Sequence, residues 1–285
     1  MFSFFKKKID PKAELQKVLK GYQLPSFPAV IMQILQKIRS PYASASDIAQ
    51  SLSLDPGLSI KLLSIANSAA FSPKNRVENL TQAIALVGLS QLESLVLGVG
   101  VGKSIPNKTC QWHDPSQFWL TSARRAMLAT ELSLILCPAK ESECFTTAFL
   151  QDMALPFLAC NRSEEYEPIF KKWHLEGGDL TQLEREIFPW DHAQVATWIC
   201  SEWGLPENIA LGIKYHHKAD ADSGYEALGP VVLVAMLREG DSSEENGIEE
   251  IIDEAQKLFN IPEDKMQSII ESSFEKAKDL ARMIV

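Results

Sequence analysis

Cysteine is scarce in this chain of 285 residues, and no two cysteines form a CxxC pair. An odd number of thiols without such a pair argues against a disulfide framework. It favours reduced, mostly packed thiols in a cytoplasmic protein. The five thiols belong to Cys110, Cys137, Cys144, Cys160 and Cys200.

Long apolar runs and an excess of positive charge are also lacking. The sequence shows no signal peptide and no apolar run long enough to span a membrane. A net charge of −9 argues against a general nucleic-acid binder, because phosphate contacts need a basic face. We therefore expect a cytoplasmic protein with no membrane span and no nucleic-acid partner.

Several motifs of nucleotide-binding proteins and hydrolases are missing as well. There is no Walker-type loop, no GxGxxG and no GxSxG. One glycine-rich stretch, "GVGVG" at residues 98–102, lies late in an apolar helical run. Close packing between helices explains this stretch better than phosphate binding does.

Regular β alternation is absent, whereas helical spacing of apolar residues is found nearly everywhere. Asp10 before Pro11 and Asp55 before Pro56 are typical of helix starts. The sequence therefore predicts an all-α protein. A first helix is expected over residues 10–20, followed by a compact bundle of short helices up to about residue 105.

A polar, proline-containing segment over residues 104–115 predicts a boundary. Beyond it we expect longer helices, then a charged turn and two amphipathic helices near 248–259 and 263–284. The apolar stripe of the last helix is expected to face the core, with a partner helix as the alternative. The helices predicted between boundary and turn cover residues 116–136, 142–155, 160–175, 180–187, 190–203, 206–217 and 225–238.

Candidate chemistry centres on one carboxylate and three histidines. Asp152 lies in the apolar stretch "AFLQDMALPFL" (148–158), where a carboxylate needs a metal, a cation or hydrogen-bond donors. His192 opens one predicted helix, and His216 and His217 end another. Such residues can converge into a metal site. They also fit helix termini, where a histidine at a C-terminus gains from the macrodipole. His113 and His174 are expected to be exposed.

The order of these segments resembles the HDOD domain, the HD-related output domain of bacterial signalling proteins. The resemblance covers roughly residues 20–240 and agrees in order and spacing at many positions. The pieces that carry it are Leu24–Pro25 with Pro28, Asp55–Pro56, Leu62–Leu63 to Asn67–Ser68, Ala83–Ile84 to Gly88–Leu89, "FWLTSARRA", "AFLQDMALPFL", "DHAQVATWICSEWGLP" and "YHH".

The resemblance implies two packed helical subdomains, an N-terminal short-helix bundle and a C-terminal HD-like bundle. It predicts an N-terminal lead-in helix (1–20) and an HDOD domain (21–240), in which 21–105 form the first bundle and 116–240 the second. The amphipathic helices of 241–285 are then expected to pack on the HD-like part.

The family is related to HD phosphohydrolases, all-helical metal enzymes that cleave phosphate esters. The resemblance places Thr121, Gln151 and Met236 where these enzymes carry three of four metal ligands. A glutamine amide cannot replace an imidazole nitrogen as a ligand, and a thioether does not suit hard ions. We therefore expect no catalytic residues, no bound metal and no cofactor. Asp152, His192, His216 and His217 would remain as a relic cleft, a buried polar cluster with satisfied hydrogen bonds.

The expected function is that of a non-catalytic signalling or scaffolding protein that acts through protein contacts. Its partners would be signalling proteins, such as receiver, diguanylate-cyclase or phosphodiesterase proteins. The contact surface is expected on the N-terminal bundle or in the groove between the two halves.

Two alternatives stay open. One is a divergent HD-type metal-dependent phosphohydrolase or phosphodiesterase that uses Asp152 and the three histidines. The other is a nucleotide-binding regulator that uses the relic cleft, with Trp190, Trp198 and Trp203 stacking a base. Core packing is the competing use of these tryptophans.

Overall fold

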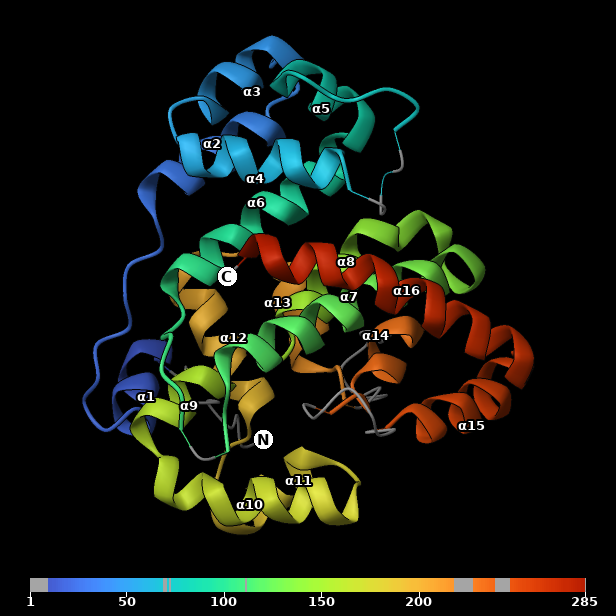
Figure 1. Ribbon diagram of the computed structural model, residues 1–285. Coiled ribbons are helices and arrows are strands. Elements are labelled where there is room, and N and C mark those ends of the chain that lie inside the picture. Colours follow the sequence, from blue (N-terminus) through green and yellow to red (C-terminus); the bar gives the residue numbers. More distant parts are fainter. Residues whose placement is uncertain are drawn as a thin grey trace, which may run out of the picture.

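The computed structural model describes residues 10–68, 71, 73–110, 112–217, 228–238 and 247–284. Over these ranges the chain is helical and has no β-strand, apart from a single antiparallel bridge between Cys110 and His113. The predicted all-α fold is therefore confirmed, with two packed helical subdomains (Figure 1).

The N-terminal bundle consists of short helices α2 to α6 at the top of Figure 1. Its helix starts follow from local sequence: Asp55 caps α4 by accepting from the Leu58 N–H, and Ser44 and Asp47 form a capping box at α3. The helices are α2 (Ala29–Arg39), α3 (Ala45–Leu52), α4 (Pro56–Ala66), α5 (Leu80–Val87) and α6 (Leu89–Ser104).

The glycines of "GVGVG" allow α6 to approach its neighbours closely. A Cβ on Gly100 would lie 2.5 Å from Phe27 Cζ, and one on Gly98 would lie 2.9 Å from Phe149 Cε1. Real Cβ atoms do not come so close, so a side chain at either position would force the neighbouring ring to move. Helix packing is the use that the sequence predicted for this stretch.

The second half forms the HD-like bundle below. Figure 1 shows α7 and α12 in its interior, with α10 and α11 along its lower edge. Its elements are α7 (Pro115–Leu136), the 3-10 turn η1 (Pro138–Lys140), α8 (Glu141–Leu150), α9 (Leu155–Asn161), α10 (Ser163–Glu176), α11 (Leu180–Ile187), α12 (His192–Trp203), α13 (Glu207–Lys214) and α14 (Gly229–Val234).

The helix predicted over 142–155 was wrong at its C-terminal end. Helix α8 ends at Leu150, and a tight turn leads into α9 at Leu155. Pro156 explains the break, because its ring would clash with the carbonyl of Asp152 in a continuous helix. The Leu155 N–H instead bonds the Asp152 carbonyl at 2.9 Å. This turn sets the position of Asp152.

Helices at both ends of the chain pack on the HD-like half, and the last helix also reaches the N-terminal bundle. Lead-in helix α1 (Pro11–Val18) packs on α12. After α15 (Ile248–Phe259), α16 (Glu263–Ile284) packs along α7 and also contacts α4 and α6 of the N-terminal bundle (Figure 1). The predicted boundary at 240–241 lies outside the described residues.

In the part of the chain that the structure describes, no single helix is long and apolar enough to cross a membrane. Helices α5 and α6 are long and apolar enough only when taken together, and the chain bends by 111° between them. Gly88 lies at the bend with φ +79°, a backbone conformation that favours glycine.

His113 was wrongly predicted to be exposed. Its side chain is buried, and its ring contacts those of Trp112 and Phe118. The polar sequence around it gave no sign of this, because only the folded chain places the rings of Trp112 and Phe118 against the imidazole. Burial lowers the pKa of His113 to about 4.

This pKa predicts a loss of stability in mild acid. The unfolded imidazole binds its proton near pH 6.5, whereas the folded one stays neutral to about pH 4. Stability present above pH 6.5 is therefore lost as the pH falls, by about 2 kcal/mol at pH 5. Urea unfolding at pH 7.5 and pH 5 should show this difference, and His113→Gln should reduce it. If His113→Gln lost as much stability between pH 7.5 and pH 5 as the unaltered chain, groups other than His113 would be responsible.

Candidate functional site: a buried histidine–aspartate cluster

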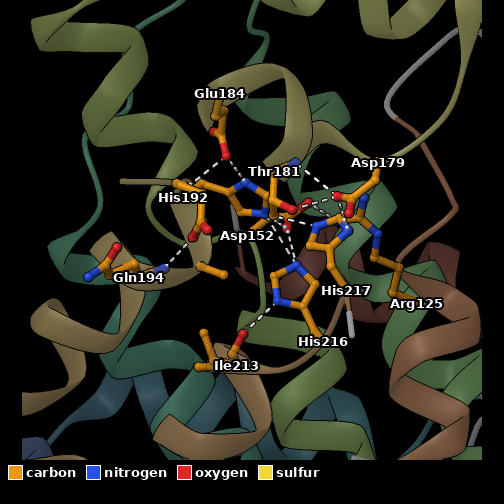
Figure 2. Close-up of polar contacts among 12 residues, drawn as sticks. Arg125, Asp152, Asp179, Thr181, Glu184, His192, Gln194, Ile213, His216 and His217 are labelled. Atoms are coloured by element: carbon orange, nitrogen blue, oxygen red, sulfur yellow. Dashed lines mark hydrogen bonds and ion pairs between the residues drawn. The ribbon is translucent and has the colours of Figure 1, made fainter. Parts of the chain in front are cut away.

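Three helix ends bring the candidate residues together. Asp152 lies in the turn between α8 and α9, His192 is the first residue of α12, and His216 and His217 follow the last turn of α13. The side chain of Asp191 caps α12 by accepting from the Gln194 N–H at 2.8 Å. Figure 2 shows the three imidazole rings turned toward one another.

The four side chains converge at one point. The Nε2 atom of His192 lies 3.2 Å from His216 Nε2 and 3.1 Å from His217 Nε2. Asp152 Oδ1 lies 3.4 Å from His192 Nε2 and 3.3 Å from His216 Nε2. The side chains of Asp152, His192 and His216 are 6%, 0% and 0% exposed, and that of His217 is 13% exposed. This group of side chains could hold a metal ion.

Each imidazole has an oxygen atom at its other nitrogen. His192 Nδ1 lies 2.8 Å from Glu184 Oε2, His216 Nδ1 lies 2.6 Å from the Ile213 carbonyl oxygen, and His217 Nδ1 lies 3.2 Å from Asp179 Oδ1 (Figure 2). These oxygens accept an N–H and so orient the rings.

Glu184 is itself held by several donors. The Tyr166 hydroxyl donates to Oε1, and the backbone N–H of His192 donates to Oε2 at 2.9 Å. Both Glu184 and Tyr166 are fully buried. Buried polar groups of this kind are stable only when hydrogen-bonded, so α10, α11 and α12 are tied together at the cluster.

Arg125 of α7 completes the surroundings of Asp152. Its guanidinium group is buried, and Nη1 pairs with Asp152 Oδ2. Nε and Nη2 both donate to the carbonyl oxygen of Leu237, Nε at 3.1 Å. Asp152 therefore uses one oxygen for the histidines and the other for a cation supplied by the protein.

The electrostatics follow from burial and from these pairs. Burial raises the pKa of Asp152, but the charge of Arg125 and the hydrogen bonds from His192 and His216 outweigh it and hold the pKa well below its usual range. Burial lowers the pKa of His192, but the charges of Glu184 and Asp152 raise it well above its usual range. Burial and the neighbouring histidines lower the pKa of His217.

The structure thus brings together all four residues predicted for the relic cleft. Of the residues expected in place of metal ligands, Thr121 and Gln151 are buried and Met236 is half-buried. None of them supplies an imidazole or a carboxylate. Neither amide atom of Gln151 has a hydrogen-bond partner within the described residues.

Sequence reasoning missed Arg125, Glu184 and Asp179. One signal was available for Arg125, since it lies within a helix of small and apolar residues, four positions after Thr121. Glu184 lies four positions after the apolar Leu180, on the buried face of α11. The partner of each charge could not be predicted, because it comes from a distant part of the chain.

The tryptophans considered for base stacking are core residues. Trp190 stacks on Phe188 with ring centroids 4.3 Å apart, and Trp203 Nε1 donates to the Pro25 carbonyl oxygen at 2.8 Å. Trp198 is buried as well. These contacts favour packing over nucleotide stacking.

Comparison with known families identifies the fold. Residues 24–219, more than two thirds of the chain, match the model of the HDOD domain. This chain belongs to the HDOD family. The predicted family is therefore confirmed.

One curated protein is similar to this chain over most of its length. An uncharacterized protein of Treponema pallidum (strain Nichols) is 25% identical over 267 residues, which make up 88% of this chain and 50% of that protein. This HDOD chain therefore spans about half the length of that curated relative.

Two solved structures share the fold. One is a provisionally assigned phosphohydrolase of Shewanella amazonensis SB2B, with a TM-score of 0.71, 20% identity and coverage of 94% of this chain and 98% of that one. The other is a provisionally assigned signal transduction protein of Marinobacter aquaeolei VT8, with a TM-score of 0.69, 16% identity and coverage of 96% and 65%. At such identities the likeness establishes the fold alone.

Proposed function

We propose that this HDOD protein is a non-catalytic signalling module that acts through contacts with other proteins. The observation that supports the absence of catalysis is the buried pair of Arg125 and Asp152. Hydrolysis by two metal ions needs ligands that bind both ions. A guanidinium group at Asp152 Oδ2 takes the place that a second cation would need.

The residues at the expected ligand positions support the same proposal. Thr121, Gln151 and Met236 replace three ligands of HD enzymes, as the resemblance implies. The cluster is also closed, since its four ligand atoms come from buried or nearly buried side chains. A catalytic metal site keeps an open position for water or substrate.

A surface between the two halves suits the proposed protein contacts. A pocket of about 210 Å³ lies where α4, α6, α7, α8 and α16 meet. Leu134 on its edge is 51% exposed, and Lys276 of α16 pairs with Glu131 of α7 at 2.5 Å. The partners would be receiver, diguanylate-cyclase or phosphodiesterase proteins.

Five free thiols are consistent with a cytoplasmic location.

An assay for phosphate-ester hydrolysis tests the first half of the proposal. The chain would be incubated with bis(p-nitrophenyl) phosphate and cyclic dinucleotides in the presence of Mg²⁺, Mn²⁺, Fe²⁺ or Ni²⁺. We expect the unaltered chain to hydrolyse these substrates no faster than the Asp152→Asn variant does. Metal-dependent turnover that Asp152→Asn abolishes, while Asp114→Asn at the start of α7 retains it, would establish the phosphohydrolase alternative.

A binding assay tests the second half. The purified chain would be titrated with purified receiver, diguanylate-cyclase and phosphodiesterase proteins from the same genome. We expect Leu134→Glu to weaken binding of a partner about tenfold or more, because a charge at an apolar contact is unpaired when buried. Leu258→Glu on α15, equally exposed at 53%, should leave it unchanged. If Leu134→Glu and Leu258→Glu changed partner binding equally, the partner would bind a surface other than the one around Leu134.

A further inference from the structure

We propose that Cys137 and Cys144 are a redox modification site, a thiol pair that a hydroperoxide converts into a reversible disulfide. The sequence-based expectation of reduced, packed thiols then describes the resting state of the protein. This disulfide is independent of the proposed function, because it is detected by thiol counts and linked peptides rather than by partner binding or hydrolysis.

The two thiols touch at the junction of α7 and α8. Cys137 directly follows the last residue of α7, and Cys144 is the fourth residue of α8. Their Sγ atoms are 3.7 Å apart, so one thiol is a weak hydrogen-bond donor to the other. A disulfide requires the two sulfurs to approach to about 2.0 Å. Rotation about a Cα–Cβ bond moves a sulfur atom over distances of this size.

Cys137 lies outside the helices. It separates α7 from the turn η1, with φ −155° and ψ 68°. Its N–H donates to the Ser133 carbonyl at 2.8 Å, and its carbonyl accepts from the Lys140 N–H at 2.9 Å. These bonds hold the main chain, and Cys144 is held within α8. The disulfide therefore forms by rotation of the Cys137 side chain, and neither helix has to unfold.

The two thiols differ in exposure, and this difference assigns their roles. Cys144 is fully buried, whereas Cys137 is half-buried. Burial and the neighbouring Cys137 raise the pKa of Cys144 above its usual range, so Cys144 stays a thiol. An oxidant dissolved in water therefore reacts with Cys137, and Cys144 is the thiol that resolves the product.

The oxidation takes two steps. In the first, the Cys137 thiolate attacks one oxygen of hydrogen peroxide, the O–O bond breaks, and the departing hydroxide takes up a proton as water. In the second, the Cys144 sulfur attacks the sulfur of the sulfenic acid, the S–O bond breaks, and the hydroxide leaves as water with the proton of Cys144. The two thiols lose two electrons, and the peroxide is reduced to two water molecules.

The surroundings of the pair favour the disulfide over the sulfenic acid. Both thiols adjoin an apolar cluster that includes Leu128, Leu132 and Ala148. A disulfide in this place leaves no hydrogen-bonding group buried without a partner, whereas a sulfenic acid adds a polar one. In a reducing cytoplasm the bond would be transient, as redox-sensing disulfides there are.

The bond would form beside the pocket between the two halves of the protein. Leu134 of α7 and Phe145 of α8 both line this pocket. Cys137 lies three positions after Leu134, and Cys144 directly precedes Phe145. Oxidation would therefore tie together two helices that form one wall of the pocket.

Peptide mapping after oxidation tests the proposal. The full chain would be treated with a small excess of hydrogen peroxide and alkylated. We expect the loss of two of the five free thiols, a mass lower by two hydrogen atoms and full recovery with dithiothreitol. Trypsin cleaves after Lys140 and chymotrypsin after Phe145, so digestion with both places Cys137, Cys144 and Cys160 in different peptides. The peptides of Cys137 and Cys144 should be linked.

Variants separate the roles of the two thiols. Cys137→Ser should keep all its remaining thiols free under the same treatment. Cys144→Ala removes the resolving thiol, so the sulfenic acid of Cys137 should persist and be trapped by dimedone. Cys160→Ser is the matched control, because that thiol is also half-buried, and it should form the linked peptides as the unaltered chain does.

Several outcomes would overturn the proposal. One is a folded, unaltered chain that keeps all its thiols free after treatment. Another is a disulfide that maps to Cys110 and Cys160, or that joins two chains. A third is an equal loss of thiols in Cys137→Ser and the unaltered chain.

Discussion

Replacing Arg125 with methionine is expected to lower the free energy of unfolding by ~3–5 kcal/mol. The variant leaves the Asp152 carboxylate buried with one oxygen unpaired, and it removes both donors to the Leu237 carbonyl. An uncompensated buried charge is among the largest single destabilising changes. Urea unfolding at pH 7, followed by far-UV circular dichroism, measures the effect.

The neighbouring residue provides a matched control. Arg124 lies on the same helix, is half-buried and places its guanidinium over the Phe274 ring at 4.8 Å. Arg124→Met removes the same number of atoms without leaving a charge buried, and we expect a loss of about 1 kcal/mol. A loss in Arg125→Met no larger than this would show that Asp152 is compensated by other groups.

A double variant isolates the pair itself. Arg125→Met combined with Asp152→Asn removes both charges, so the loss should be smaller than the sum of the two single losses by about 2 kcal/mol or more. Additive losses would instead mean that the two residues act separately.

Replacing Trp203 with alanine is expected to lower the free energy of unfolding by ~3–5 kcal/mol. The ring is buried and packs against Phe27 and Phe157, at centroid distances of 5.5 and 6.1 Å. Its Nε1 also donates to Pro25. Trp203 thereby holds the segment between α1 and α2 against α12, and its removal leaves a cavity between the two halves.

Two further variants define this effect. Trp203→Phe keeps a ring but loses the hydrogen bond to Pro25, so a loss of about 1–2 kcal/mol is expected. Tyr42→Ala removes a ring that is 93% exposed and should stay within about 0.5 kcal/mol of the unaltered chain. Thermal unfolding measures all three variants. A Trp203→Ala loss below that of Trp203→Phe would contradict the packing role.

Much of the fold was predictable from local patterns. Asp10 and Asp55 cap the helices that their positions before Pro11 and Pro56 indicated. These signals were readable because capping and apolar spacing act within a few residues of one another. The end of α8 was predicted wrongly because apolar spacing continues through Pro156, and the steric effect of proline decided against it.

The candidate site was predictable in its members but not in its surroundings. Asp152, His192, His216 and His217 stood out as polar residues in apolar or helix-end positions. Arg125 and Glu184 did not, because a charged residue on a helix is usually solvated and only burial makes it part of a site. The expected exposure of His113 failed for the same reason.

The sequence alone determined the helical class, the positions of most helix starts and the family, since these depend on residues close together or on their order along the chain. The tertiary structure alone decided which charges meet. Arg125 and Asp152 are 27 positions apart, and His192 and His216 are 24 apart. Only the packing of α7, α12 and α13 around the α8–α9 turn removes these groups from water, and burial is what makes each one depend on its partner.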